Sequence, residues 1–162
     1  MDQPITRILC CVGLRGDCDV VLERAVSLAL ACGAELQVLH AVKSLDDDVM
    51  NTLRVNIRSQ EVLDKLMRQR LAQAREQLDY RMDAFWSTHP EARRALGDKL
   101  ARQEVVEGYP ATLITRLAAQ RGCDLIVMAA NKRGFAASYA GKVTRGVIKR
   151  ATVPVVVVPP PA

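Results

Sequence analysis

Residues 124–158 constrain the fold most, because two short apolar runs flank a small-residue loop and an amphipathic segment. The runs 124–129 and 154–158 are typical of strands that are buried on both faces of a parallel sheet. Residues from about 139 to 150 are expected to form a helix between them. Such a loop can hold a phosphate, because backbone N–H groups at a helix N-terminus point at the anion.

The same alternation of apolar runs and helical periods continues through the rest of the chain. Further strands are expected at 5–12, 34–42 and 102–107, and further helices at 17–32, 59–89 and 110–121. Residues 43–58 show no clean period and predict a loop or a short helix, and 91–101 predict a connecting turn or a helix extension. Five strands alternating with four helices predict one α/β domain, 1–162, in which a doubly wound five-stranded parallel sheet has helices on both faces.

Helical spacing also indicates which side chains these helices bury. The first helix presents one face with Leu22, Ala25, Val26, Ala29 and Cys32. The last helix is expected to pack through Val143, Val147, Ile148 and Ala151.

Composition and cysteine use indicate a cytoplasmic protein. The chain has 162 residues, 49% of them hydrophobic, which suits one well-buried domain. No apolar run reaches the roughly 20 residues that span a bilayer, and the first residues lack the layout of a signal peptide. Five cysteines without metal-site spacing are expected to be small buried hydrophobes in a reducing compartment, with redox sensing by Cys18 as the alternative.

The positive charge is concentrated toward one end of the chain. The formal net charge is +5, and residues 125–162 hold six bases and no acids. This asymmetry favours an anionic partner, but the basic side chains themselves are interpreted first as a solvated rim, with a phosphate-bearing ligand as the alternative. Nucleic acid is not expected, because the chain has no recognisable nucleic-acid motif.

No arrangement of residues predicts catalysis or metal binding. Ser138 has no identifiable base, and His40 and His89 do not have the spacing of a metal pair. His40 ends an expected strand and is interpreted as structural. The run Asp46, Asp47 and Asp48 lacks the Gly and Glu of a calcium loop. The sequence therefore predicts a protein that is not an enzyme.

Ligands of such sheets bind beyond the carboxyl ends of the strands, where the strand order reverses. In this chain that edge is formed by Val12 and Gly13, by Ala41 and Val42, and by residues 128–132. These segments are far apart in the sequence and are expected to meet in space.

Several segments of the chain resemble the universal stress protein family. They are Arg7-Ile-Leu-Cys-Cys-Val12, Gly33-Ala-Glu-Leu-Gln-Val-Leu-His-Ala41, Gly108-Tyr-Pro-Ala111, Cys123-Asp-Leu-Ile-Val-Met128 and the stretch from Gly141 to Val158. The resemblance covers nearly the whole chain. It implies a UspA-like domain with a Rossmann-like fold of the adenine nucleotide alpha hydrolase type.

Some members of that family bind ATP through Gly-x-x-Gly, nine further residues and then Gly-Ser or Gly-Thr, with an aspartate after the first strand. This chain has Gly13 at the aspartate position, Ala129 and Lys132 at the two glycines, and Lys142 after Gly141. Only eight residues separate Lys132 from Gly141, so the motif is degenerate. The resemblance implies these pocket positions: Val12, Gly13, Ala41, Met128, Ala129, Lys132, Gly141, Lys142 and Val143.

Two functions follow from this resemblance. The first is a non-enzymatic stress-response protein that acts through protein partners and does not bind ATP in the usual way. The second is a sensor that holds ATP, another adenine nucleotide or a phosphorylated metabolite through the lysines of loop 129–142. A ligase-type enzyme on a related fold is a third, weaker alternative, because it would need a fuller phosphate loop and a further domain.

The final strand is also a candidate interface. Val155, Val156, Val157 and Val158 are short, apolar and potentially an open sheet edge, which aggregates unless it is covered or paired. Relatives in the family commonly pair this strand antiparallel across a two-fold axis, which implies a homodimer. The alternative is an edge that is capped by the Pro-rich tail.

Overall fold

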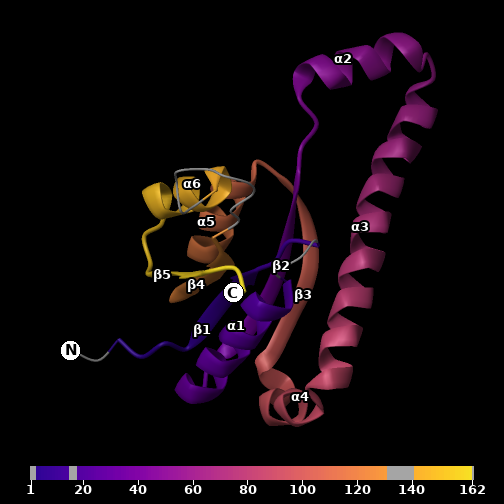
Figure 1. Cartoon of the computed structure of the whole chain (residues 1–162). Coiled ribbons are helices and arrows are strands. Elements are labelled where there is room, and N and C mark those ends of the chain that lie inside the picture. Colours follow the sequence, from indigo (N-terminus) through magenta and orange to yellow (C-terminus); the bar gives the residue numbers. More distant parts are fainter. Residues whose placement is uncertain (1–2, 15–17, 131–140, 162) are drawn as a thin grey trace.

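The structure of the chain is a computed structural model that describes residues 3–14, 18–130 and 141–161. Figure 1 shows a sheet with helices on both of its faces and a long helix, α3, that extends well beyond the sheet. The elements in chain order are β1 Arg7–Cys11, α1 Cys18–Cys32, β2 Glu35–Lys43, α2 Asp47–Asn56, α3 Gln60–Thr88, α4 Pro90–Leu96, the 3₁₀ turn η1 Gly97–Lys99, β3 Leu100–Gly108, α5 Pro110–Gln120, β4 Leu125–Ala129, α6 Lys142–Arg150 and β5 Val155–Val158.

The five strands form one parallel sheet in the order β3-β2-β1-β4-β5. β1 is central, with Cys10 opposite Val38 of β2 on one side and Val127 of β4 on the other. The chain adds strands to one side of β1 and then to the other, which is the doubly wound topology. The sequence prediction of an α/β fold with five parallel strands is confirmed.

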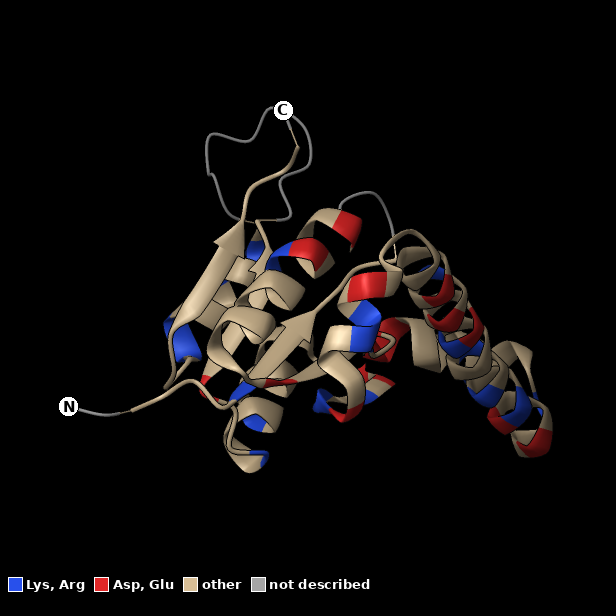
Figure 2. Ribbon diagram, turned by 90° about the horizontal axis from the view of Figure 1, so that it is seen from below, with Lys and Arg blue, Asp and Glu red and all other residues tan. Residues whose placement is uncertain are grey.

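Two hydrophobic layers hold the helices against the sheet. Helices α1 and α3 cover one face, and α5 and α6 cover the other (Figure 2). Cys10 belongs to the layer under α1 and Cys11 to the layer under α5, because successive side chains of a strand point to opposite faces. The inner strands β1 and β4 are therefore apolar along nearly their whole length, as buried parallel strands require, whereas the edge strand β3 carries exposed polar residues.

Local sequence signals mark the starts and ends of three helices at the positions that the sequence predicts. Gly33 follows α1 with a φ of +64°, a left-handed conformation that glycine adopts without strain. Ser59 caps α3, since its hydroxyl accepts a bond of 3.4 Å from the backbone N–H of Val62. Pro110 occupies the first turn of α5.

The described residues contain two helices beyond the four that the periods predict. α2 lies within 43–58, where a short helix was one of the two expectations. α4 begins at Pro90, the residue expected to stop α3. Pro90 can both stop α3 and begin α4, because proline breaks a helix interior but is tolerated in a first turn.

Two side chains predicted to be buried are exposed instead. Cys32 is the last residue of α1 and lies beyond the turns that pack on the sheet. Ile148 of α6 is 52% exposed, whereas Thr144 is fully buried. α6 packs through Thr144, Val147 and Ala151, and this orientation places Ile148 on the flank of the helix. No helix among the described residues is long and apolar enough to cross a membrane.

Candidate functional site

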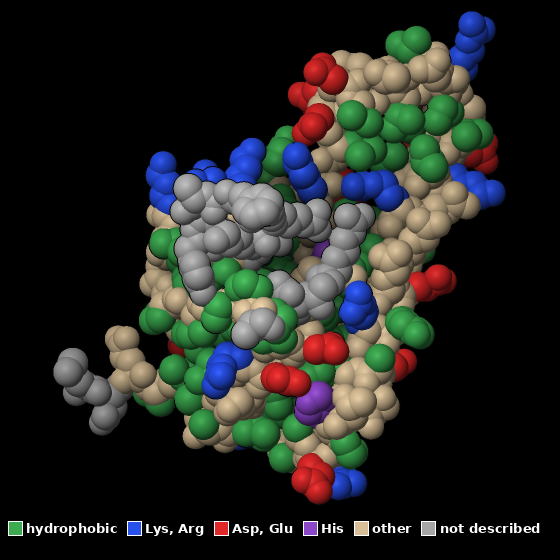
Figure 3. Space-filling model, viewed as in Figure 1, with side chains coloured by type: hydrophobic (Ala, Val, Ile, Leu, Met, Phe, Trp, Pro, Cys, Tyr) green, Lys and Arg blue, Asp and Glu red, His purple; other side chains and the backbone are tan. Residues whose placement is uncertain are grey.

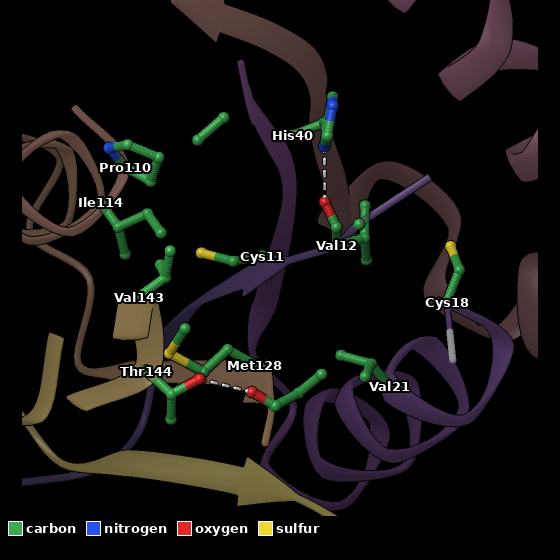
Figure 4. A pocket seen from close by; sticks show the side chains of 13 residues that line it. Cys11, Val12, Cys18, Val21, His40, Pro110, Ile114, Met128, Val143 and Thr144 are labelled. Carbon is green, nitrogen blue, oxygen red and sulfur yellow. Dashed lines mark hydrogen bonds between the residues drawn. The ribbon is translucent and has the colours of Figure 1, made fainter. Parts of the chain in front are cut away.

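A cavity of about 230 Å³ lies at the carboxyl ends of β1, β2 and β4. Figure 4 shows Cys11, Ile114 and Val143 turned toward one another on one side of it. The first turns of α1, α5 and α6 complete its wall. The lining residues are Cys11, Val12, Gly13, Cys18, Val21, His40, Ala41, Pro110, Ile114, Met128, Ala129, Val143 and Thr144.

The strand order creates this cavity. β1 has β2 on one side and β4 on the other, so the connections that follow β1 and β4 leave toward opposite faces of the sheet and open a crevice between them. Backbone hydrogen bonds extend the strand pairing past the ends of β1 and β4. The Val12 N–H donates to the Leu39 carbonyl oxygen at 2.9 Å, and the Ala130 N–H donates to the Val158 carbonyl oxygen at 2.9 Å. The edge of the cavity is therefore fixed by the sheet.

His40 is tied to the backbone at this edge. Its Nδ1 lies 2.8 Å from the carbonyl oxygen of Val12, a group that can only accept a hydrogen bond. Nδ1 is therefore the protonated nitrogen, and in the neutral ring Nε2 is left as an acceptor. This bond supports the interpretation of His40 as structural, but His40 also lines the cavity.

The start of α6 is fastened to the end of β4 by two hydrogen bonds. The hydroxyl of Thr144 donates to the carbonyl of Ala129 at 2.8 Å, and the Gly141 N–H donates to the carbonyl of Ala130 at 2.7 Å. Gly141 is the N-cap residue of α6 and brings no side chain to cap it. The first-turn amides of α6 have no acceptor within the helix, so this end is suited to an anion.

The family model for the universal stress protein family matches residues 4–159. The chain belongs to the universal stress protein family. The resemblance seen in the sequence is thereby confirmed. No curated protein matches the chain.

Solved structures of the family share the fold. A universal stress protein of Lactobacillus plantarum is 22% identical and superposes with a TM-score of 0.68, with 97% of this chain and 99% of that chain covered. A universal stress protein solved in complex with cAMP is 18% identical (TM-score 0.60; 96% and 98% covered). The universal stress protein of Archaeoglobus fulgidus, solved in complex with dAMP, is 19% identical (TM-score 0.55; 96% and 99% covered).

The structure brings most of the predicted site residues of this family member together. Val12, Gly13, Ala41, Met128, Ala129 and Val143 all line the cavity. Gly141 and Lys142 lie at the start of α6, beside the lining residues, and the Lys142 side chain is exposed. Lys132 lies outside the described residues, as does most of loop 129–142. The binding role of all these residues stays a prediction.

Sequence reasoning missed a second group of lining residues. These residues are Cys11, Cys18, Val21, His40, Pro110, Ile114 and Thr144. Most of them come from the first turns of α1, α5 and α6, whose N-termini meet at the edge where the parallel strands end. Pro110 was recognised as the start of a helix, and that position was the available signal for its place at the site.

The cavity wall is mainly apolar and uncharged. Burial raises the pKa of the Cys18 thiol to about 11 and the pKa of the Cys11 thiol well above its usual range. Both therefore stay neutral thiols near pH 7. Within the part of the chain that the structure describes, no carboxylate lines the cavity and no cluster of three or more metal-binding side chains occurs. The site combines a neutral wall with an anion-favouring helix end.

Proposed function

We propose that this protein is a non-enzymatic stress-response protein that binds a small adenine nucleotide, with the nucleoside in the cavity and a phosphate at the start of α6. The observation that carries this proposal is the position of the cavity: its apolar wall ends at the N-terminus of α6, where the N-cap residue Gly141 makes no side-chain cap. A flat, uncharged base suits the wall, and a phosphate suits the helix amides. The family structures solved with cAMP and dAMP support the same ligand class.

Size and residue types favour a monophosphate over ATP bound in the usual way. About 230 Å³ is below the roughly 300–1,000 Å³ of pockets that enclose a whole ligand. Ala129 places a Cβ on the cavity wall where family members that bind ATP have glycine. Lys142 provides one exposed ammonium at the first position of α6. A cation there is unfavourable beside the helix dipole unless an anion lies between them.

A binding role, rather than a catalytic one, is supported by the chemistry of the wall. The two thiols that line the cavity have raised pKa values and are weak nucleophiles. His40 donates through Nδ1 to a backbone carbonyl, which occupies that nitrogen. The lining residues that the structure describes therefore offer no activated nucleophile.

Calorimetry with AMP, cAMP, adenosine and ATP tests the nucleotide proposal. Binding of AMP or cAMP at one site per chain is expected, with adenosine weaker because it has no phosphate. Ala41→Phe, which fills the half-buried cavity edge, should abolish the heat, and Ala101→Phe on the exposed side of β3 should not. Absence of binding by every nucleotide at millimolar concentration would exclude the proposal.

A homodimer through β5 is the second proposal, and the position of this strand favours it. Among the described residues β5 pairs only with β4, so its other side is a sheet edge. The carbonyls of Pro154 and Val158 accept bonds from the β4 side. Because successive residues of a strand alternate, the N–H and C=O of Val155 and Val157 point toward the edge. A second β5 strand would satisfy these groups.

Light scattering after size exclusion tests the dimer. A mass of two chains is expected at micromolar concentration. Val157→Pro removes an N–H that faces the edge and should give monomers, whereas Val157→Thr keeps the N–H and should leave the dimer intact. A wild-type chain that elutes only as a monomer would contradict the proposal.

A further inference from the structure

Helix α3 supports the edge of the cavity without lining it. None of the described lining residues belongs to α3, yet two of its arginines bind the chain at that edge. Arg81 Nη2 donates a hydrogen bond of 2.9 Å to the carbonyl oxygen of Leu14, which follows β1. Arg70 donates to the carbonyl oxygen of Lys43, at the end of β2, at 2.8 Å and contacts the Glu107 carboxylate of β3 at 3.4 Å. Figure 3 shows basic side chains where α3 borders the body of the molecule.

The two arginines lie on the same side of α3. They are eleven residues apart, which is about three helical turns. That side of the helix therefore faces the carboxyl ends of β1, β2 and β3 together. These ends form the edge at which the cavity lies.

Gly13 is the part of the cavity wall that most needs this support. Among the described residues, a Cβ at Gly13 would meet nothing within 4 Å beyond its chain neighbours, so packing does not fix this position. Glycine also has more backbone freedom than other residues. The carbonyls on either side of it are fixed instead, because His40 donates to Val12 at 2.8 Å and Arg81 donates to Leu14. The position of Gly13 therefore depends on two side chains from other elements.

Arg81 also acts at the far end of the connection from β1 to α1. Cys18 is the first residue of α1 and lines the cavity. Burial, and then the charge of Asp19, raise the pKa of the Cys18 thiol, whereas the charge of Arg81 lowers it. The half-buried Arg81 guanidinium is therefore close enough to the thiol to act on it.

We propose that Arg81 is a positioning residue, whose bond to Leu14 holds Gly13 and Cys18 in the arrangement that admits a ligand to the cavity. This inference rests on the proposed nucleotide function and extends it to a residue outside the site. Arg81 is not a lining residue and acts through the Leu14 carbonyl. It borders a separate hollow on the α3 side, whose other lining residues are Leu14, Glu76, Gln77 and Tyr80.

Loss of the Arg81 bond should leave only a fraction of the molecules with Gly13 and Cys18 in place. A ligand then binds that fraction alone, and its apparent affinity falls accordingly. The factor is the same for every ligand of the cavity, because Arg81 contacts none of them. A residue that contacts phosphate would instead weaken only the ligands that carry one. Adenosine and AMP therefore separate the two roles.

Calorimetry of Arg81→Met with adenosine and with AMP makes this comparison. Methionine keeps an apolar stem and removes the donors, so both affinities should fall by one common factor of about ten. Arg81→Lys keeps a charged donor and should recover most of the loss. Arg68→Met, at an exposed position of the same helix, should bind both ligands as the wild type does. A loss confined to AMP, or unchanged affinity for both ligands, would overturn the positioning role.

Thiol labelling without a ligand keeps this inference separate from the nucleotide proposal, because it decides the role of Arg81 even if the wild type binds no nucleotide. In a Cys32→Ser background, which removes the exposed thiol, Arg81→Met should label Cys18 about tenfold faster, since less of the chain is held closed. The variant also removes a charge that lowers the Cys18 pKa, which by itself slows labelling, so a faster rate reports opening.

Cys123 is the internal control for this labelling. It is 3% exposed, compared with 2% for Cys18, and it lies before β4, at the opposite edge of the sheet. Peptide mass mapping separates the two sites. The rate at Cys123 should be the same in Arg81→Met as in its parent. Equal acceleration of both thiols would show a general loss of stability and would overturn the proposal, as would an unchanged rate at Cys18.

Discussion

The hydroxyl of Thr144 donates a hydrogen bond of 2.8 Å to the carbonyl oxygen of Ala129. Thr144 is fully buried in the first turn of α6, and Ala129 ends β4. This bond fixes the helix start against the sheet on the wall of the cavity. Thr144 is removed from bulk water and Ala129 is half-buried, so loss of the hydroxyl leaves the Ala129 carbonyl poorly compensated.

Thr144→Val is expected to lower the free energy of unfolding by about 1–2 kcal/mol, because valine keeps the shape but leaves the Ala129 carbonyl without its donor. Urea denaturation measures the change. Thr112→Val, at an exposed position of α5, should change stability by less than about 0.5 kcal/mol. Equal effects of the two substitutions would show that the buried bond contributes nothing.

The crossing of α5 and α6 gives a second prediction. A Cβ at Gly146 would lie 2.8 Å from the Cβ of Ala111, an atom that is fixed to the backbone. Alanine favours a helix by about 1 kcal/mol over glycine, but overpacking costs about 1–3 kcal/mol. Gly146→Ala should therefore destabilise the protein in thermal unfolding. Adding Ala111→Gly to this variant should recover part of the loss, and a stabilised single variant would contradict the close approach.

The central strands could be predicted from the sequence because a strand that is buried on both faces has a continuous apolar run. The runs at 5–12 and 124–129 contain β1 and β4. The sequence did not predict α2 and α4 as definite helices, because each has too few residues to show a clear helical period. Cys32 shows a further limit, because a periodic face continues to the end of a helix even where no neighbour covers it.

Five of the thirteen described lining residues were found from strand ends, Val143 came from the family resemblance, and the other seven were missed. Val12 and Ala41 follow directly from the rule that ligands bind beyond the carboxyl ends of parallel strands. Val21 and Ile114 belong to the hydrophobic layers under α1 and α5, and neither position follows from a strand end. A helical period identifies a buried side but not which turn of that side borders a cavity.

Acid should weaken the hydrogen bonds that join the start of β1 to Asp124, the residue before β4. The Asp124 carboxylate accepts bonds from the Thr6 N–H at 2.9 Å, the Thr6 hydroxyl at 2.8 Å and the Arg7 N–H at 3.0 Å. The backbone bond from Thr6 is the largest cause that lowers the pKa of Asp124, followed by the bond from its hydroxyl. A depressed folded pKa adds stability above the unfolded value of about 3.9, and this is lost as pH falls through the folded value.

Asp124→Asn should therefore be less stable than the wild type above about pH 5, and the difference should shrink toward pH 3. Urea denaturation from pH 3 to 7 measures both chains. Asp98→Asn, at an exposed aspartate of the η1 turn, serves as the control and should show no such convergence. A difference between wild type and Asp124→Asn that stays constant with pH would contradict the stabilising role of the ionised carboxylate.

Thiol labelling should distinguish the exposed cysteine from the buried ones. Burial raises the pKa of Cys10, Cys11, Cys18 and Cys123, whereas Cys32 is exposed. One thiol per chain should react quickly with a disulfide reagent at pH 8, and all five should react in denaturant. Cys32→Ser should remove the fast reaction. Fast labelling of Cys18 in the folded chain would instead support redox sensing at that residue.

The phosphate contact proposed at α6 can be tested with two lysines of the same helix. Lys142 is the first residue of α6, and Lys149 lies in its last turn; both residues are exposed. Lys142→Ala should weaken AMP binding about tenfold at low salt, because a charge-assisted hydrogen bond to phosphate is lost. The loss should shrink as salt is raised, since ions screen the exposed pair. Lys149→Ala makes the same change in net charge about two turns away, so equal losses in both variants would show a diffuse charge effect and no contact at the helix start.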